Sequence, residues 1–324
     1  MHRFLCWVGA IALIVSLAAS APAVAQSYPE RPVMVVVPFP PGAGVDIVTR
    51  LIAGKLSEAM GQTFVVENKP GAAGNLGAEY ASRATPDGYT LLAAPSSIAA
   101  SETLYKNLRF SLERDFAPVA MMASVPFLLV ANPSVPANNL KELIALAKAQ
   151  PNKITFASTG VGSSPHLTME MFMRDAHVSM LHVPYKGTGP ALVDLLSGQV
   201  NVMFGNMLSV LPSVKAGKMK ALAVSSAEPS PAIPEVPTVA SQGLPGFESS
   251  TWFALVAPKG TPDAILDRLN AEVRKIVEMP DVKRALLLQG AEAGKGSREQ
   301  VGAYIKGEVA KWGTIVKASG IKIE

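Results

Sequence analysis

Apolar runs alternate with amphipathic stretches along the first third of the chain after residue 30. The run VMVVV (33–37) predicts a buried strand, and residues 47–60 have apolar side chains at helical spacing. TFVVE (63–67), a helix over 74–84 and YTLLAA (89–94) follow in the same alternation. This strand–helix order is typical of a parallel sheet with helices on its faces, and it predicts an α/β fold.

The same alternation returns after residue 126. It predicts strands over 127–131, 154–158, 200–204 and 221–226, and helices over 140–150, from Pro165 onward and over 190–197. Two segments, LLVANPSVPANNLKELIALAKA and ALVAPKGTPDAILDRLNAEVRK, resemble each other as strand, proline-containing turn and helix, beginning near Phe127 and Phe253. We interpret them as the two places where the chain passes between lobes, at about 126 and 249. The predicted lobes are therefore residues 27–125 plus 249–324, and residues 126–248.

The N-terminal pattern is different from the rest. The basic start MHR precedes the apolar segment FLCWVGAIALIVSLAA, and AVA places small residues just before Gln26. These features predict a signal peptide over 1–25 and a periplasmic protein. A transmembrane anchor is the alternative, but about 16 apolar residues followed by a cleavage signal suit a signal peptide better.

Composition narrows the possible chemistry. The chain has 324 residues, 49% of them hydrophobic and 17% charged, which is enough for two ordinary domains. Its single cysteine, Cys6, lies in the signal segment, so the mature chain is expected to have no disulfide and no cysteine metal site. The formal net charge of +4, without long basic runs, argues against nucleic acid as a partner. After the signal segment, His166, His177 and His182 lack metal-ligand spacing, and we expect neither a metal nor a cofactor.

Three glycine-rich turns follow predicted strands and precede predicted helices. They are PFPPGAGVD (38–46), STGVGSSPH (158–166) and PYKGTGPA (184–191). In parallel α/β sheets, ligands bind beyond the carboxyl ends of the strands, where such turns lie. A helix N-terminus there offers unpaired N–H groups and about half a positive charge, and glycine lets the backbone approach a ligand closely. The turns therefore suit an anion held by main-chain amides.

Turn formation alone also explains part of this pattern. Asp46 is a reasonable helix-start residue, and Ser163 or Ser164 ahead of Pro165 is typical of an N-cap with proline at the first helical position. The recurrence of such turns in both halves favours the ligand-binding interpretation. No phosphate loop, dinucleotide motif or G-x-S-x-G motif occurs, so we predict that the protein is not an enzyme.

Five stretches together resemble one known family. They are YPERPVMVVVPFPPGAGVDIVTRLIAGKL, VVENKPGAAGNLGAEYASRATPDGYTLL, ASTGVGSSPHL, HVPYKGTGPALVDLLSGQVNVMF and EVPTVASQGLPGFESSTWFALVAPKGTP. Over the whole mature chain the sequence is similar to the extracytoplasmic substrate-binding proteins of tripartite tricarboxylate transporters, the Bug family. The resemblance implies a two-lobed Venus-flytrap fold (type II periplasmic binding protein), each lobe a mainly parallel sheet flanked by helices. It also implies a small carboxylate ligand between the lobes and two integral membrane transporter subunits as partners.

The resemblance implies that main-chain amides of the turns around Phe39–Asp46 and Ser158–His166 hold the ligand carboxylate. Tyr185 and Lys186 are expected to contact the far end of the anion, and His166 is a candidate to face it. The full set of expected ligand-binding residues is Phe39, Gly42, Ala43, Gly44, Asp46, Ser96, Ser158, Thr159, Gly160, Ser163, Ser164, His166, Tyr185, Lys186 and Asn206.

Ala43, Val45 and Gly205 depart from the usual family pattern, so the resemblance does not identify the ligand. We expect a monomeric periplasmic solute-binding protein that delivers a small organic acid to a transporter. A ligand-presenting receptor for a membrane sensor kinase would share the same fold and cleft, so the sequence does not separate the two. A periplasmic enzyme acting on small acids is the third alternative.

Overall fold

A computed structural model describes residues 28–105, 107–288 and 290–321. The chain divides into two compact units after Glu30. The described residues of the first unit, 28–30, include a cis peptide bond between Tyr28 and Pro29. The predicted signal peptide, 1–25, lies outside the described residues. All elements below belong to the second unit, Arg31–Glu324.

The described part of the second unit contains a ten-stranded sheet. The strands are β1 (Val33–Val37), β2 (Phe64–Asn68), β3 (Thr90–Pro95), β4 (Phe116–Ala131), β5 (Thr155–Ser158), β6 (Leu181–Pro184), β7 (Val202–Asn206), β8 (Lys220–Val224), β9 (Ser250–Pro258) and β10 (Glu292–Ala293). Eight of them follow the order β2-β1-β3-β9-β4-β7-β5-β6, and β8 and β10 also pair with β4.

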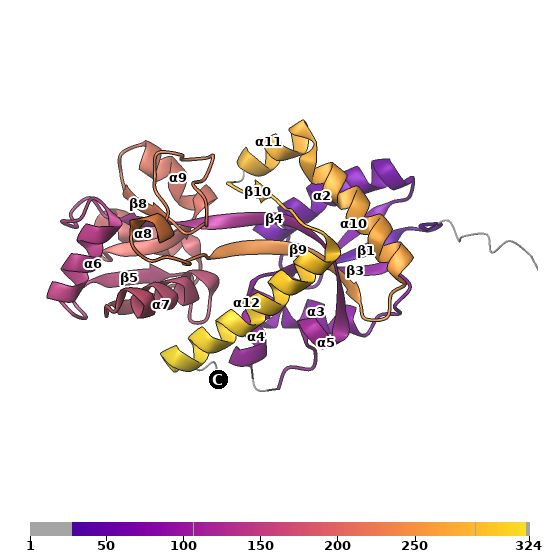
Figure 1. The fold of residues 1–324 in the computed structure, drawn as a ribbon, viewed down its shortest axis with the longest axis horizontal. Helices are drawn as coiled ribbons and strands as arrows, with labels where there is room; N and C mark the ends of the chain where they lie inside the picture. Colours follow the sequence, from indigo (N-terminus) through magenta and orange to yellow (C-terminus); the bar gives the residue numbers. More distant parts are fainter. Residues whose placement is uncertain (1–27, 106, 289, 322–324) are drawn as a thin grey trace, which may run out of the picture. The chain divides into compact units, whose positions relative to one another are not determined.

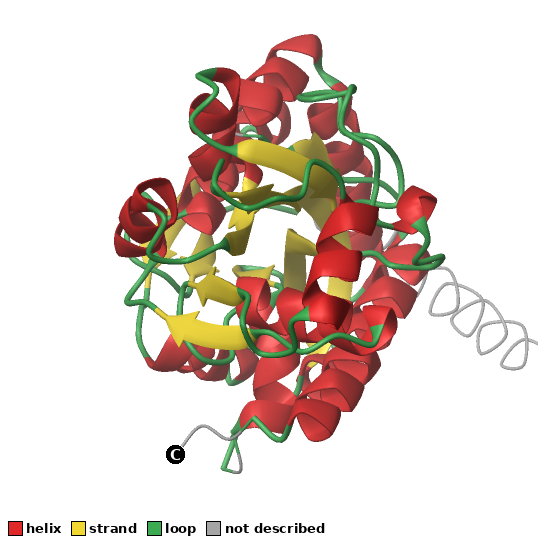
Figure 2. Ribbon diagram, turned by 90° about the vertical axis from the view of Figure 1, so that its left-hand side faces the viewer, coloured by secondary structure: helices red, strands yellow, loops and turns green. Residues whose placement is uncertain are grey.

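Helices lie on the outside of these strands (Figures 1 and 2). They are α2 (Gly44–Met60), α3 (Asn75–Ser82), α4 (Ser97–Leu104), α5 (Leu112–Asp115), α6 (Leu140–Ala149), α7 (Ser164–Ala176), α8 (Thr188–Ser197), α9 (Met207–Lys215), α10 (Asp263–Glu278), α11 (Pro280–Leu288) and α12 (Arg298–Ser319). Short 3-10 helices cover Ala72–Gly74 and Ala240–Gln242.

Each half of the sheet has a parallel part, as the alternation of strands and helices predicts. β1 pairs in parallel with β2 and β3, and β5 pairs in parallel with β6 and β7. All five residues of β1 are apolar, as expected for a strand that is covered on both faces. The predicted two-lobed α/β fold is confirmed. The strands where the two halves meet are antiparallel, however, because β9 pairs with β3 and β4 in that sense.

Strand β4 belongs to both halves of the sheet. It pairs with β9 as far as Pro126 and with β7 from Phe127 onward. Figure 1 shows β4 and β9 running side by side between the two groups of helices. The expected crossings near 126 and 249 fall where β4 changes partner and just before β9 begins. The lobe bounds themselves stay a prediction.

A buried glutamate of α12 links this helix to β9. The buried Glu308 carboxylate accepts hydrogen bonds from the indole nitrogens of Trp252 on β9 and Trp312 on α12, both at 2.9 Å. Lys311 forms an ion pair with the same carboxylate. The pairing and the hydrogen bonds make the buried charge of Glu308 tolerable. Because one of those bonds comes from Trp252, the cluster holds β9 against α12. That strand carries two residues of the cavity described below.

Several elements differ from those expected, including the following three. Strand β4 begins at Phe116, well before the predicted start at 127. Helices α4 and α9 were not expected: α4 (SIAASETL) is short and rich in serine and alanine, and α9 contains Pro212. The α4 sequence has no clear apolar stripe at helical spacing, so tertiary packing decides its conformation. The α9 sequence has apolar residues at 207, 210, 211 and 214, but Pro212 interrupts this helical pattern.

Candidate functional site

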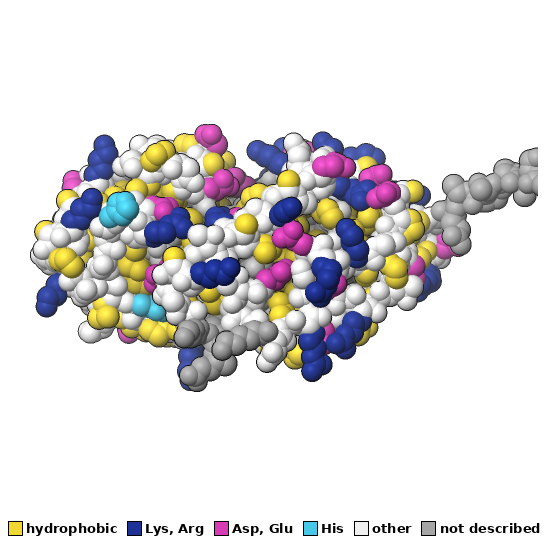
Figure 3. All heavy atoms as spheres, turned by 60° about the horizontal axis from the view of Figure 1, so that its bottom comes forward, with side chains coloured by type: hydrophobic (Ala, Val, Ile, Leu, Met, Phe, Trp, Pro, Cys, Tyr) yellow, Lys and Arg dark blue, Asp and Glu magenta, His cyan; other side chains and the backbone are white. Residues whose placement is uncertain are grey.

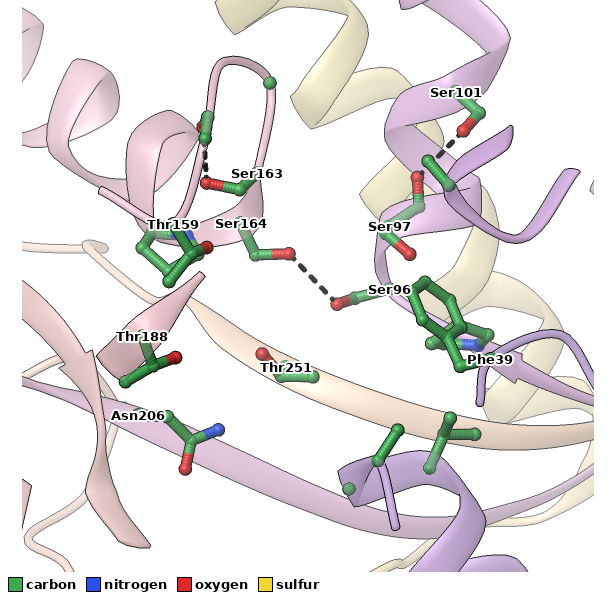
Figure 4. Close-up of a pocket in the computed structure, with 18 of the residues that line it drawn as sticks. Phe39, Ser96, Ser97, Ser101, Thr159, Ser163, Ser164, Thr188, Asn206 and Thr251 are labelled. Carbon is green, nitrogen blue, oxygen red and sulfur yellow. Dashed lines mark hydrogen bonds between the residues drawn. The ribbon is translucent and has the colours of Figure 1, made fainter. Parts of the chain in front are cut away.

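A cavity of about 480 Å³ lies among strand ends and helix starts from both halves of the sheet (Figure 4). This volume is within the range of about 300–1,000 Å³ that holds small-molecule ligands. Phe127 of β4 and Phe253 of β9 line it from the two strands that connect the halves. The cavity is therefore built where the crossing strands meet the loops that precede the helices.

Several helices begin at this cavity. The first residues of α2, α4, α7 and α8 line it, and so does Asn206, which directly precedes α9; the five lining residues are Gly44, Ser97, Ser164, Thr188 and Asn206. First-turn N–H groups have no partner within their helix, and each helix start has a partial positive charge. None of the described lining residues is Asp, Glu, Lys, Arg or His. The field that favours an anion here comes from helix starts, not from charged side chains.

The first glycine-rich turn, 38–46 (the Asp46 turn), is held by an aspartate. Gly42, whose φ of +83° favours glycine, donates its N–H to Asp46 Oδ2 at 2.9 Å. Arg50 Nε and Asn68 Nδ2 donate to the same carboxylate, at 3.0 Å and 2.8 Å from Oδ1. Burial raises the pKa of Asp46, but the hydrogen bonds from Arg50, Gly42 and Asn68 outweigh it and lower that pKa below 3.8. Asp46 thus stabilises the turn and does not itself line the cavity.

The second turn, 158–166 (the His166 turn), is held by a histidine in the same way. Gly162 donates its N–H to His166 Nδ1 at 3.0 Å. Ser163 donates both its N–H and its hydroxyl to the carbonyl of Gly160, at 3.2 Å and 2.7 Å. Gly160 in turn donates its N–H to Ser158 Oγ at 3.2 Å. The turn is closed on itself by these bonds.

Two histidines stack behind the His166 turn. The rings of His166 and His182 are 3.9 Å apart between centroids, and Phe156 stacks on His182 at 4.7 Å. Because Nδ1 of His166 accepts from Gly162, its proton lies on Nε2, which is 3.4 Å from Glu170 Oε1. Burial, with a contribution from the neighbouring His166, lowers the pKa of His182 to about 4. His182 therefore packs as a neutral ring at pH 7.

These bonds change which groups can hold a ligand. The N–H groups of Gly42, Gly160, Gly162 and Ser163 all donate inside their own turns. The glycines shape the turns, and the donors that remain at the cavity are first-turn amides and hydroxyl groups. The hydroxyl-bearing residues on its lining are Ser96, Ser97, Ser101, Tyr105, Thr159, Ser163, Ser164, Thr188 and Thr251.

Two of these hydroxyls face each other from the two halves. Ser96 Oγ and Ser164 Oγ are 3.5 Å apart, which is long for a hydrogen bond between hydroxyls. Figure 4 shows this pair in the middle of the cavity. Ser97 Oγ, next along the chain, is buried without a hydrogen-bond partner. An acceptor placed among these groups would receive donors from both halves of the protein.

The structure brings most of the expected site residues together. Those on the cavity are Phe39, Ala43, Gly44, Ser96, Thr159, Gly160, Ser163, Ser164 and Asn206. Gly42 lines an adjoining cavity of about 350 Å³. Asp46, Ser158 and His166 line neither cavity, and they support the turns from behind.

Tyr185 and Lys186 lie off both cavities as well. The Tyr185 hydroxyl donates to Asp194 Oδ2 at 2.7 Å, and burial together with that bond raises the pKa of Tyr185 to about 12. Lys186 is exposed. Thr188, a few residues later in the same turn, lines the cavity instead.

Sequence reasoning missed the contribution of α4 and of the crossing strands. The missed lining residues include Ser97, Ser101, Leu104, Tyr105, Phe127, Thr251 and Phe253. Two signals were present in the sequence. The Ser-Ser pair follows directly after an apolar strand, and Phe127 and Phe253 begin the two similar segments that were interpreted as crossings.

Other kinds of site find no support among the described residues. There, no group of three or more His, Cys, Asp or Glu side chains is arranged to hold a metal ion. Nor is any helix of the described ranges long and apolar enough to cross a membrane. On the face shown in Figure 3, Lys and Arg side chains are dispersed and do not gather in one patch.

Residues 48–321 match the protein family described as tripartite tricarboxylate transporter family receptor. The chain is 37% identical to the protein BugT of Bordetella pertussis, over 100% of this chain and 99% of that protein. A Rhodopseudomonas palustris protein solved with adipate is 36% identical, with a TM-score of 0.76 over 91% of this chain and 99% of that chain. MatC from the same organism, with bound malate, is 34% identical, with a TM-score of 0.73 over 89% of this chain and 100% of that chain.

Proposed function

Because this chain belongs to the tripartite tricarboxylate transporter receptor family, we propose that it is a periplasmic solute-binding protein that captures a small organic acid between two lobes. One observation carries the proposal: several helix starts converge on a cavity whose described lining is rich in hydroxyls and has no charged side chain. The adipate and malate bound by two relatives support a carboxylate as the ligand class. The relatives are receptors, which fits a protein that binds its ligand and does not transform it.

Helix-start amides and hydroxyls are sufficient for useful affinity. A hydrogen bond to a charged group contributes roughly 1.5–3 kcal/mol, so four of them contribute roughly 6–12 kcal/mol. Micromolar binding needs about 8 kcal/mol after the entropic costs of association. The proposed site therefore has little surplus, and the loss of a single donor should be measurable.

Titration calorimetry on single-serine variants tests this proposal. Ser96→Ala and Ser164→Ala each remove one donor from opposite sides of the cavity, so each should weaken binding of the tightest-bound acid about fivefold to thirtyfold. Ser226→Ala is the matched control, because that hydroxyl donates to Glu228 O and is not on the cavity. Unchanged affinity in both cavity variants would contradict the proposed site, and binding of no carboxylate would contradict the proposed function.

We further propose that the lobes are residues 27–125 plus 249–324 and residues 126–248, and that they close on the ligand about β4 and β9. The change of partner of β4 after Pro126 supports this boundary. An acid that accepts from both Ser96 and Ser164 would favour the closed arrangement. X-ray scattering should show a smaller radius of gyration at saturating ligand. An unchanged radius at proven saturation would count against closure.

Export and delivery to membrane subunits complete the proposal. Protein recovered from the periplasm should begin at Gln26, and a full-length product retained in the membrane would exclude cleavage there. Uptake of the bound acid should fall when the gene for this chain is deleted and return when it is expressed again. Undiminished uptake in the deletion strain would argue against delivery to a transporter.

A further inference from the structure

The cavity extends along one face of α4. Ser97, Ser101, Leu104 and Tyr105 all line it, at the spacing of residues on the same side of a helix. We call this part of the cavity the α4 arm. Figure 4 shows Ser97 and Ser101 on α4 across from Ser163 and Ser164 of the other half. A ligand held at the Ser96–Ser164 pair can therefore continue along α4.

The two ends of the α4 arm differ in their electrostatics. The arm begins at the N-terminus of α4, whose partial charge is positive, and ends at Leu104 and Tyr105, at its C-terminus. The partial charge of a helix C-terminus is negative, so it disfavours a second anionic group there. The hydroxyl of Ser101 is already engaged, since it donates to Ser97 O at 3.2 Å.

The far end of the arm offers few groups that could replace water around an anion. The α4 residues there are Leu104 and Tyr105, so the Tyr105 hydroxyl is the one side-chain donor that they supply, and the described lining of the cavity has no cationic side chain. Moving a carboxylate from water into such surroundings without compensating bonds is costly. An alkyl or aromatic group placed there gains free energy from the burial of its apolar surface.

We propose that the ligand carries one carboxylate and an apolar body, with the carboxylate at the helix starts and the body in the α4 arm. This inference rests on the proposed function and names its substrate class: aliphatic or aromatic monocarboxylates of medium length. It departs from the dicarboxylates adipate and malate that are bound by two relatives.

Matched acids separate this inference from the proposed function. Titration calorimetry of the purified protein with propionate, butyrate, pentanoate and hexanoate should show affinity rising about threefold to fourfold for each methylene. Hexanoate should bind at least about tenfold tighter than adipate, which has the same carbon chain and a second carboxylate. If adipate binds as tightly as hexanoate, the inference is wrong and the proposed function stands. If none of these acids binds but another small organic acid such as malate does, the inference is wrong and the proposed function stands; if no organic acid binds, both fail.

Variants in the arm locate the apolar body. Ser101→Leu fills the arm and should weaken hexanoate at least tenfold while leaving propionate within about twofold. Ser226→Leu, the same substitution at a position off the cavity, should leave both acids within about twofold. Tyr105→Ala should lengthen the arm and raise the affinity for octanoate relative to hexanoate, compared with the wild-type ratio. Equal losses for propionate and hexanoate in Ser101→Leu, or an unchanged octanoate-to-hexanoate ratio in Tyr105→Ala, would overturn the placement.

Discussion

The Asp46 turn and the His166 turn use the same main-chain device and differ in the side chain that completes it. In each, a glycine N–H donates to the side chain four residues later: Gly42 to Asp46 at 2.9 Å, and Gly162 to His166 at 3.0 Å. Asp46 is a charged acceptor whose charge is balanced by Arg50. His166 is an acceptor through its ring nitrogen Nδ1, and its ring packs against that of His182.

The two turns are therefore stabilised by different interactions. The Asp46 turn depends on a cluster of charge-assisted hydrogen bonds, which are strong but leave costly unpaired groups when one member is removed. The His166 turn depends on one proton being on the right nitrogen and on ring stacking. We therefore expect the first turn to determine folding stability more strongly, and the second to influence ligand affinity more strongly.

Removal of the Asp46 carboxylate should have the largest effect. Asp46→Ala leaves the N–H groups of Gly42, Arg50 and Asn68 without their acceptor, so the free energy of unfolding should fall by about 2–3 kcal/mol. Urea denaturation at pH 7 measures this. Asp46→Asn retains one acceptor oxygen and should lose about half as much. An unchanged denaturation midpoint in Asp46→Ala would mean that the turn does not depend on its anchor.

His166 should matter more for ligand affinity than for folding. His166→Leu removes the acceptor of the Gly162 N–H and should weaken the tightest-bound acid about tenfold by calorimetry. His166→Asn places its Oδ1 near the position of Nδ1, so it should restore affinity to within about threefold of wild type. A merely structural role for the ring predicts the opposite, since leucine would fill the stacked space better than asparagine.

Acid should lower folding stability in two different pH ranges, first through His182 behind the His166 turn and then through Asp46. His182 has a pKa of about 4 when folded and about 6.5 when unfolded, so the unfolded chain binds more protons between these values. Stability should therefore fall as the pH drops from about 6.5 toward 4. The pKa of Asp46 is lowered from its ordinary value of 3.8, so the contribution of this carboxylate to folding stability is lost only at more acidic pH. The charged or titratable groups that influence His182 are His166 and Glu170.

Urea midpoints at pH 7, 5.5 and 4.5 check this prediction. His182→Gln, which keeps a polar atom near Ser158, should flatten the pH dependence over that range. Asp46→Asn should leave the slope unchanged there while lowering stability throughout. A wild-type midpoint that is constant from pH 7 to 4.5 would show that the histidine stack does not couple to folding.

The smallest expected effect concerns the ion pair behind the Asp46 turn. Arg50 is about half exposed, with 49% of its side chain accessible, so its pairing with Asp46 is screened by water and salt. Arg50→Gln should cost no more than about 1 kcal/mol of stability at low salt, and less at 0.5 M NaCl. A loss as large as that of Asp46→Ala would make the ion pair, and not the Gly42 hydrogen bond, the main support of the turn.

Much of the fold could be predicted because it depends on short-range patterns. The apolar run at β1 and the helical spacing of α2 are legible in the sequence, and so are the glycine turns that join strand to helix. Helix α4 is different, because its eight residues have no clear apolar stripe and owe their conformation to packing against α12. The part of the site that α4 supplies was missed for this reason.

The sequence by itself determined that the chain alternates strands and helices, and that glycine-rich turns precede α2 and α7. Only the tertiary structure decided which groups of those turns face the cavity. Asp46 of α2 is turned away by Asn68 of β2, and His166 of α7 by its contact with His182 of β6. Local pattern fixes where a turn occurs, because it depends on neighbouring residues. The direction of a side chain depends on contacts between segments that only folding brings together.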